Sequence, residues 1–125
     1  MEFLLRHSFL KSLFIILLSL LIFGKAFATN TSTGTNALSS LTTGTYNTAN
    51  GYLSLYSNTT GYRNTATGAL SLYFNTSGYE NTALGDMSLN SNTTGIKNTA
   101  IGQDSMRSNT TGDYNTAIGH DSLVF

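Results

Sequence analysis

The sequence predicts an all-β fold, a parallel β-roll or β-solenoid of 17-residue coils that follows an N-terminal helical signal peptide. Three observations support this prediction: a strict internal repeat, two glycines at fixed places in each repeat unit, and an apolar leader at the start of the chain. We therefore divide the chain into a signal peptide, residues 1–28, and a repeat domain, residues 29–125.

The leader has the three parts of a secretory signal peptide. Arg6 and Lys11 lie in a short basic start, an apolar run follows at residues 12–24, and Ala26-Phe27-Ala28 is a small-x-small site, so we expect cleavage after Ala28. The competing interpretation is an uncleaved membrane anchor, but a spanning helix needs about 20 apolar residues. We therefore expect a protein that is secreted or lies on the outer cell surface, with no membrane span after cleavage.

The repeat is marked by the triplet Asn-Thr-Ala, which recurs once in every unit from Asn47 onward. Units begin at residues 30, 47, 64, 81, 98 and 115, and the last unit stops partway, at Phe125. The consensus is N-T-A-x-G-x-x-S-L-x-x-N-T-T-G-x-x. We number its positions as columns 1 to 17, so that Asn30 and its equivalents occupy column 1.

The glycines of the repeat domain all lie in columns 5 and 15. Fixed glycines suit turns that need a positive φ or a close backbone approach. Threonine and isoleucine favour strands, whereas glycine, threonine and asparagine are poor helix formers. We therefore expect strands near columns 1–4 and 7–10, with corners at the glycines. These structural corners are Gly34, Gly44, Gly51, Gly61, Gly68, Gly78, Gly85, Gly95, Gly102, Gly112 and Gly119.

Stacked coils place equivalent residues about 4.8 Å apart. Threonines of column 2 and asparagines of columns 1 and 12 are therefore expected to form ladders of side-chain hydrogen bonds. Alternation along a strand sends columns 2 and 3 to opposite faces, so we assign columns 3 and 9 to the core. The predicted core ladder is Leu38, Leu55, Leu72, Leu89, Met106, Leu123, Ala49, Ala66, Ala83, Ala100 and Ala117.

This core is thin, and a small core usually needs support from oligomerisation. Column 4 offers a surface for it. The residues of this column are polar in the first three units and apolar in the last three, where they are Leu84, Ile101 and Ile118. A face that changes in this way is better explained by a partner surface than by a core.

The segment N-T-A-I-G at residues 98–102 resembles the YadA-like head repeat of trimeric autotransporter adhesins, and the whole unit resembles repeats of bacterial surface and tail-fibre-like proteins. The resemblance implies a homotrimer of left-handed parallel β-rolls that binds a host matrix protein or a cell-surface glycan. Two departures are that the family's usual unit is shorter, and that neither stalk heptads nor barrel strands follow. A truncated, non-functional adhesin fragment therefore stays open as an alternative.

Side chains suited to catalysis or metal binding are few. The repeat domain has one histidine, His120, and no cysteine, so we expect neither an enzyme nor a cofactor. Asp104 and Asp121 share column 7, and we interpret them as exposed corner residues rather than a metal site. Only a calcium-dependent shift in melting temperature would favour the metal site. The formal net charge of zero gives no reason to expect a nucleic-acid partner.

Two alternatives concern the surface. Tyrosines gather with Phe74 in the second and third units, where they either pack over the corners or form an aromatic contact patch for a partner or a glycan. Ice or another extended surface is the alternative ligand, bound by a threonine ladder in column 13. The ladder comprises Thr59, Thr76, Thr93 and Thr110.

Mass spectrometry of the exported protein tests the leader assignment. Because the small-x-small site ends at Ala28, we expect Thr29 to be the first residue of the mature chain. An intact Met1 on the exported protein would contradict the assignment.

Overall fold

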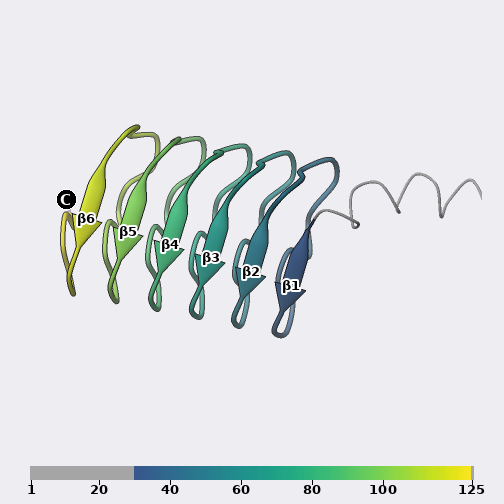
Figure 1. The fold of residues 1–125 in the computed structure, drawn as a ribbon, viewed down its shortest axis with the longest axis horizontal. Coiled ribbons are helices and arrows are strands. Elements are labelled where there is room, and N and C mark those ends of the chain that lie inside the picture. The colour runs from purple at the N-terminus through teal and green to yellow at the C-terminus, as the bar shows by residue number, and fades with distance from the viewer. Residues whose placement is uncertain (1–29, 125) are drawn as a thin grey trace, which may run out of the picture.

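The computed structural model describes residues 30–124, which form a β-solenoid with one short parallel strand in each coil (Figure 1). The fold class predicted from the repeat is confirmed. The proposed leader and its cleavage site at Ala28 lie outside the described residues. The six strands are β1 (Thr31–Thr33), β2 (Thr48–Asn50), β3 (Thr65–Thr67), β4 (Thr82–Leu84), β5 (Thr99–Ile101) and β6 (Thr116–Ile118).

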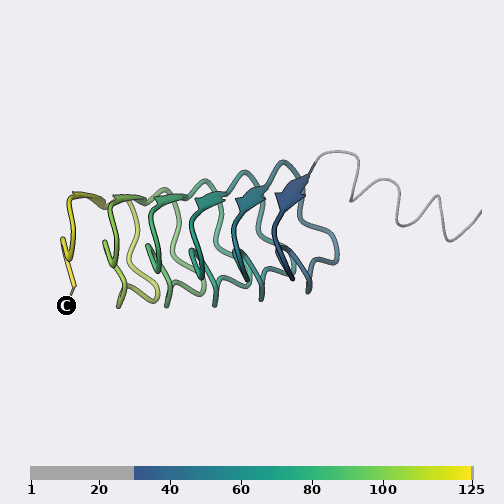
Figure 2. The same cartoon turned by 90° about the horizontal axis from the view of Figure 1, so that it is seen from below.

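The strands form a single sheet in the order β1-β2-β3-β4-β5-β6. Each strand pairs with the next in parallel at an offset of one repeat, as in Thr48 with Thr65 and Ala49 with Ala66. Every column therefore becomes a row of equivalent residues along the solenoid axis. Figure 2 shows the strands along one side of the solenoid and the turns of the coils on the other.

Columns 3 and 9 fill the apolar half of the interior. Ten residues of these two columns are buried, including Leu72, Leu89 and Ala83, none of which is exposed at all. Leu123 differs from the expectation because its side chain is 44% exposed. It lies in the sixth coil, and no described residue stacks over that coil. Burial in a solenoid comes from the coil on each side, so identical residues differ in burial at its ends.

The other half of the interior is polar and is filled by the asparagines of columns 1 and 12. Asn75 donates from Nδ2 to Asn58 Oδ1 at 2.8 Å and to the Gly78 carbonyl at 3.0 Å, and it accepts from Asn92 Nδ2 at 2.9 Å. In column 1, Asn64 Oδ1 accepts from the Asn81 backbone N–H at 3.0 Å. The expected asparagine ladders are present, and they satisfy amides that are fully buried.

The threonine ladder expected in column 2 does not form. Over residues 30–124, the hydroxyl groups of this column make no hydrogen bond, and column 2 lies on the outward face of the sheet, opposite the buried alanines. In a parallel sheet in register, the hydroxyl groups of neighbouring threonines lie at the same level on the face of the sheet. Their hydroxyls are free to bond water instead.

The strand expected near columns 7–10 is also wrong, because this segment consists of turns. Columns 7 and 9 adopt the left-handed backbone region, with φ of 58° at Leu70 and 50° at Leu72. Their N–H groups bond to opposite neighbours: Leu70 to the Tyr52 carbonyl at 2.9 Å and Leu72 to the Ser88 carbonyl at 3.1 Å. These inter-coil hydrogen bonds and the burial of column 9 offset the cost of a positive φ in a residue that is not glycine.

Column 17 is left-handed as well, and columns 7, 9 and 17 share a feature of composition. None of them contains valine, isoleucine or threonine in the described coils, although threonine is common elsewhere in the repeat. Branching at Cβ makes a positive φ especially unfavourable. The left-handed backbone accounts for this absence in columns 7, 9 and 17. The absence does not identify these columns, because columns 1, 3, 5, 8, 11, 12 and 15 lack such residues too.

The two glycine columns meet different requirements. Gly51 in column 5 has a φ of +144°, and a Cβ there would lie 2.5 Å from the Gly68 carbonyl oxygen. Gly95 in column 15 has no left-handed φ, but a Cβ would lie 2.6 Å from the Gly112 carbonyl oxygen. Column 5 therefore needs glycine for its dihedral angle and for space, and column 15 needs it for space alone.

The asparagine ladders predict the outcome of two matched substitutions. Asn75→Ala leaves Asn58 Oδ1 and one Asn92 N–H buried without a partner. We expect this substitution to lower the free energy of unfolding by about 2–6 kcal/mol, since each of the two groups costs about 1–3 kcal/mol. Asn50→Ala also removes an inter-coil hydrogen bond, at 2.7 Å from Thr33 Oγ1, but an exposed one. Asn50→Ala should lower the free energy of unfolding by about 0.5 kcal/mol. Urea denaturation followed by circular dichroism measures both, and equal losses would contradict the importance of the ladders.

Candidate functional site

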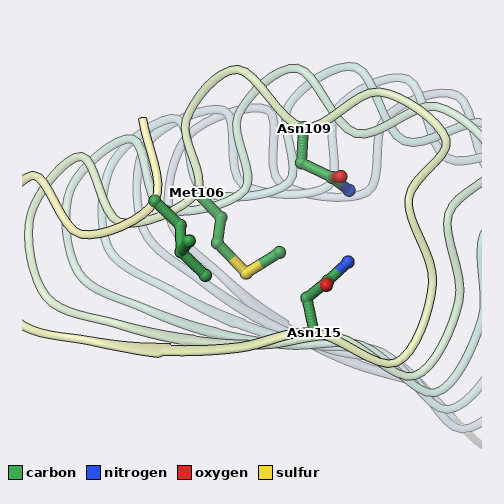
Figure 3. Close-up of a pocket in the computed structure, with 4 residues that line it drawn as sticks. Met106, Asn109 and Asn115 are labelled. Atoms are coloured by element: carbon green, nitrogen blue, oxygen red, sulfur yellow. The ribbon is translucent and has the colours of Figure 1, made fainter. Parts of the chain in front are cut away.

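The hollow drawn in Figure 3 lies at the C-terminal end of the described coils. Its lining residues are Met106, Asn109, Asn115 and Leu123. They belong to columns 9, 12, 1 and 9, whose other members fill the interior of the preceding coils. The hollow is thus a continuation of the interior and not a separate site. The candidate functional surfaces are therefore the outward-facing columns.

The outward face of the sheet is formed by columns 2 and 4 and changes along its length. Over β1–β3, column 4 is polar. Over β4–β6 it holds Leu84, which is 47% exposed, Ile101, which is half-buried, and Ile118, which is 70% exposed. We call these three residues the apolar strip. The parallel register sets them in one row, with Leu84 paired to Ile101 and Ile101 to Ile118.

The column 13 threonines of the first four coils do not offer free hydroxyl groups. Thr59 Oγ1 donates to the Thr76 carbonyl at 3.0 Å, Thr76 Oγ1 to the Thr93 carbonyl at 3.2 Å, and Thr93 Oγ1 to the Thr110 carbonyl at 3.0 Å. This ladder, which the sequence suggested as an ice-binding surface, therefore serves to join coils. Column 2 offers an unbonded threonine row instead, on the face of the sheet.

The aromatic residues stack in register with the coils. Tyr56 and Tyr73 have ring centroids 5.3 Å apart and nearly parallel planes, and Phe74 meets Tyr73 edge-on at 4.6 Å. A second parallel pair, Tyr62 and Tyr79, has centroids 4.6 Å apart. In each pair one face of each ring is covered by its neighbour. This stacking between adjacent coils favours packing over the corners.

Column 17 forms an exposed row of charged and aromatic side chains. Glu80 accepts from Arg63 at 3.1 Å and lies 4.0 Å from Lys97, and Lys97 Nζ lies 5.0 Å from the ring centroid of Tyr114. The hydrogen bond to Tyr114 Oη raises the pKa of Lys97 above its ordinary value. All these groups face solvent, so their contribution to stability is small.

Three potential metal ligands meet at the fifth and sixth coils. The stacking of column 7 brings Asp104 beside Asp121, as the sequence indicated, and the structure adds His120 from column 6. One ligand atom from each residue lies within 4.8 Å of those of the other two. His120 Nδ1 is 2.9 Å from Asp121 Oδ2, and Arg107 Nη1 is 3.4 Å from Asp104 Oδ1. Sequence reasoning found no partner for His120, because a period alone does not show where the corner side chains point.

No helix within residues 30–124 has the length and hydropathy required to cross a membrane.

Comparison with known proteins gave no match. A scan against protein-family models found none, and neither did searches of the curated proteins and of the solved structures.

Proposed function

We propose that the chain is an exported, non-enzymatic structural or adhesive repeat protein that binds a host matrix protein or a cell-surface glycan. The observation that supports this most is the difference between the inward and the outward columns. The inward columns are packed or hydrogen-bonded, and the outward columns form straight rows of variable side chains. A repeat scaffold of this kind spreads recognition over an extended face.

The proposal includes self-association as a homotrimer through the apolar strip. Exposed apolar side chains in a contiguous row usually mark an interaction surface. The strip is flanked on the same face by the column 2 threonines Thr82 and Thr99, both of which are half-buried. A second and third copy of the chain would cover this part of the sheet and add apolar burial to the thin core of a single solenoid.

Light scattering of the purified protein tests self-association. We expect a trimer for the unmodified chain and a monomer for a triple variant, Leu84→Thr, Ile101→Thr and Ile118→Thr, because threonine already occupies column 4 in the first and third units. Phe74→Ser is the matched control. It removes an exposed apolar residue from column 11, which holds serine in neighbouring units, and should leave the trimer intact. A monodisperse monomer of the unmodified chain would contradict the proposal.

Adhesion itself is tested by binding of the purified chain to immobilised collagen, fibronectin and whole cells. Binding to at least one of these above an albumin control is expected for an adhesin. Uniformly negative results would remove the adhesive function while leaving the trimer measurement unaffected.

A second candidate, binding of ice or another extended surface, is favoured by the free threonine hydroxyls of column 2. The parallel sheet holds this row at a regular spacing of about 4.8 Å. If the sheet binds ice, the chain should inhibit ice recrystallisation and Thr65→Tyr should abolish the inhibition. Thr60→Tyr, on exposed column 14, should have no effect. Absence of inhibition by the unmodified chain would eliminate this candidate.

A further inference from the structure

We propose that Asp104, His120 and Asp121 bind a divalent transition-metal ion that links the fifth and sixth coils. This site is independent of the proposed adhesive function. It also revises our interpretation of the two aspartates as plain corner residues, since the structure adds a nitrogen ligand and an oxygen that lacks a hydrogen bond.

Backbone pairing fixes the relative position of the two carboxylates. The Asp121 N–H donates to the Gln103 carbonyl at 3.0 Å, and the Asp104 N–H donates to the Asp86 carbonyl at 2.9 Å. Asp104 and Asp121 also share the same backbone conformation, with φ of 55° and 53°. The two side chains therefore leave adjacent coils from equivalent positions and in the same direction.

The separation of the ligand atoms matches a small metal ion. At metal–ligand distances of about 2.0–2.2 Å, neighbouring ligands of an octahedral ion lie about 3 Å apart and opposite ligands about 4.2 Å apart. His120 Nδ1 and Asp121 Oδ2 are 2.9 Å apart, which suits neighbouring positions. The three ligand atoms lie within 4.8 Å of one another. A pair at that upper limit would have to close by about 0.6 Å around a metal, and the exposed side chains of His120 and Asp121 can make this movement.

The environment of the Asp104 carboxylate favours a bound cation. Its Oδ1 atom is enclosed by the protein, with less than 1 Å² exposed, and accepts no hydrogen bond. The guanidinium of Arg107 lies 3.4 Å from this oxygen without hydrogen-bond geometry, and Gln103 Nε2 donates to the other oxygen at 3.4 Å. Like charges at equivalent positions of adjacent coils repel, and Asp121 adds a second negative charge. A cation bound by the Asp104 and Asp121 carboxylates would remove this repulsion.

The types of ligand atom at the site indicate which class of metal ion it would bind. One imidazole nitrogen and two carboxylates suit Zn²⁺, Mn²⁺ or Co²⁺, whereas Ca²⁺ takes six to eight oxygen ligands. His120 and Asp121 are largely exposed, so water fills the remaining positions. Among the described coils, only the fifth and sixth can form this site, since column 7 holds asparagine, leucine or methionine in the others.

Titration with Zn²⁺ alone tests the site, using the full mature chain without a polyhistidine tag and after removal of metals by a chelating resin. We expect one Zn²⁺ per chain by isothermal titration calorimetry and an increase in melting temperature that Ca²⁺ does not reproduce. Co²⁺ should produce visible absorption bands that Zn²⁺ then displaces. No Zn²⁺ binding, or equal binding of Ca²⁺, would overturn the proposal.

Variants assign the ligands. Asp104→Asn and His120→Ala should each weaken Zn²⁺ binding at least tenfold. Asp86→Asn is the matched control, because this aspartate is exposed in the neighbouring column and outside the cluster, and it should bind as the unmodified chain does. Arg107→Ala removes the competing guanidinium and should tighten binding. Circular dichroism verifies that each variant is folded. Binding retained by both Asp104→Asn and His120→Ala would place the metal elsewhere and overturn the proposal.

Discussion

The structure depends on hydrogen bonds between successive coils, above all those of the buried asparagines. An asparagine amide carries both donors and acceptors, so a row of asparagines can bond to itself and to the neighbouring backbone indefinitely. Asn75 shows this in full, because it bonds to the asparagine below, the asparagine above and the carbonyl of its own turn. Such a ladder satisfies the hydrogen-bonding groups of the asparagine amides in every coil in the same way. It is lost if one coil shifts by a single residue. It therefore specifies register as well as contributing stability.

The same inter-coil bonds allow a backbone that would otherwise be unfavourable. Each complete coil contains three left-handed residues besides glycine, and single residues of this kind are uncommon in proteins. In this solenoid they let the chain turn within one repeat unit while each N–H still reaches a carbonyl of an adjacent coil, as at Leu70 and Leu72. The cost of the left-handed backbone is offset only when neighbouring coils are present. Folding should therefore be cooperative between adjacent repeats.

Because the interior is so strictly specified, most of the variation between units lies on the outside of the solenoid. Column 4 changes from threonine to leucine and isoleucine with the parallel register unchanged. Column 7 changes from leucine to aspartate with almost the same φ, 58° at Leu70 and 55° at Asp104. A binding surface can thus change from coil to coil on a constant scaffold. The apolar strip and the cluster of Asp104, His120 and Asp121 both lie in the later coils. Each combines residues that come from successive repeat units.

The coil length, the parallel register, the inward placement of columns 3 and 9 and the asparagine ladders of columns 1 and 12 all follow from the sequence, because a strict period leaves few other ways to align alanine, leucine and asparagine. The burial of those asparagines is shown only by the structure. The turn at columns 7–10 does not follow from it, since propensity alone assigns this segment to a strand. The left-handed residues there are stabilised by hydrogen bonds to the preceding and the following coil, as at Leu70 and Leu72. The period also does not distinguish the bonded threonines of column 13 from the free ones of column 2, or bring His120 to the two aspartates. Those outcomes depend on side-chain direction at the corners, which is set only when the coils stack on one another.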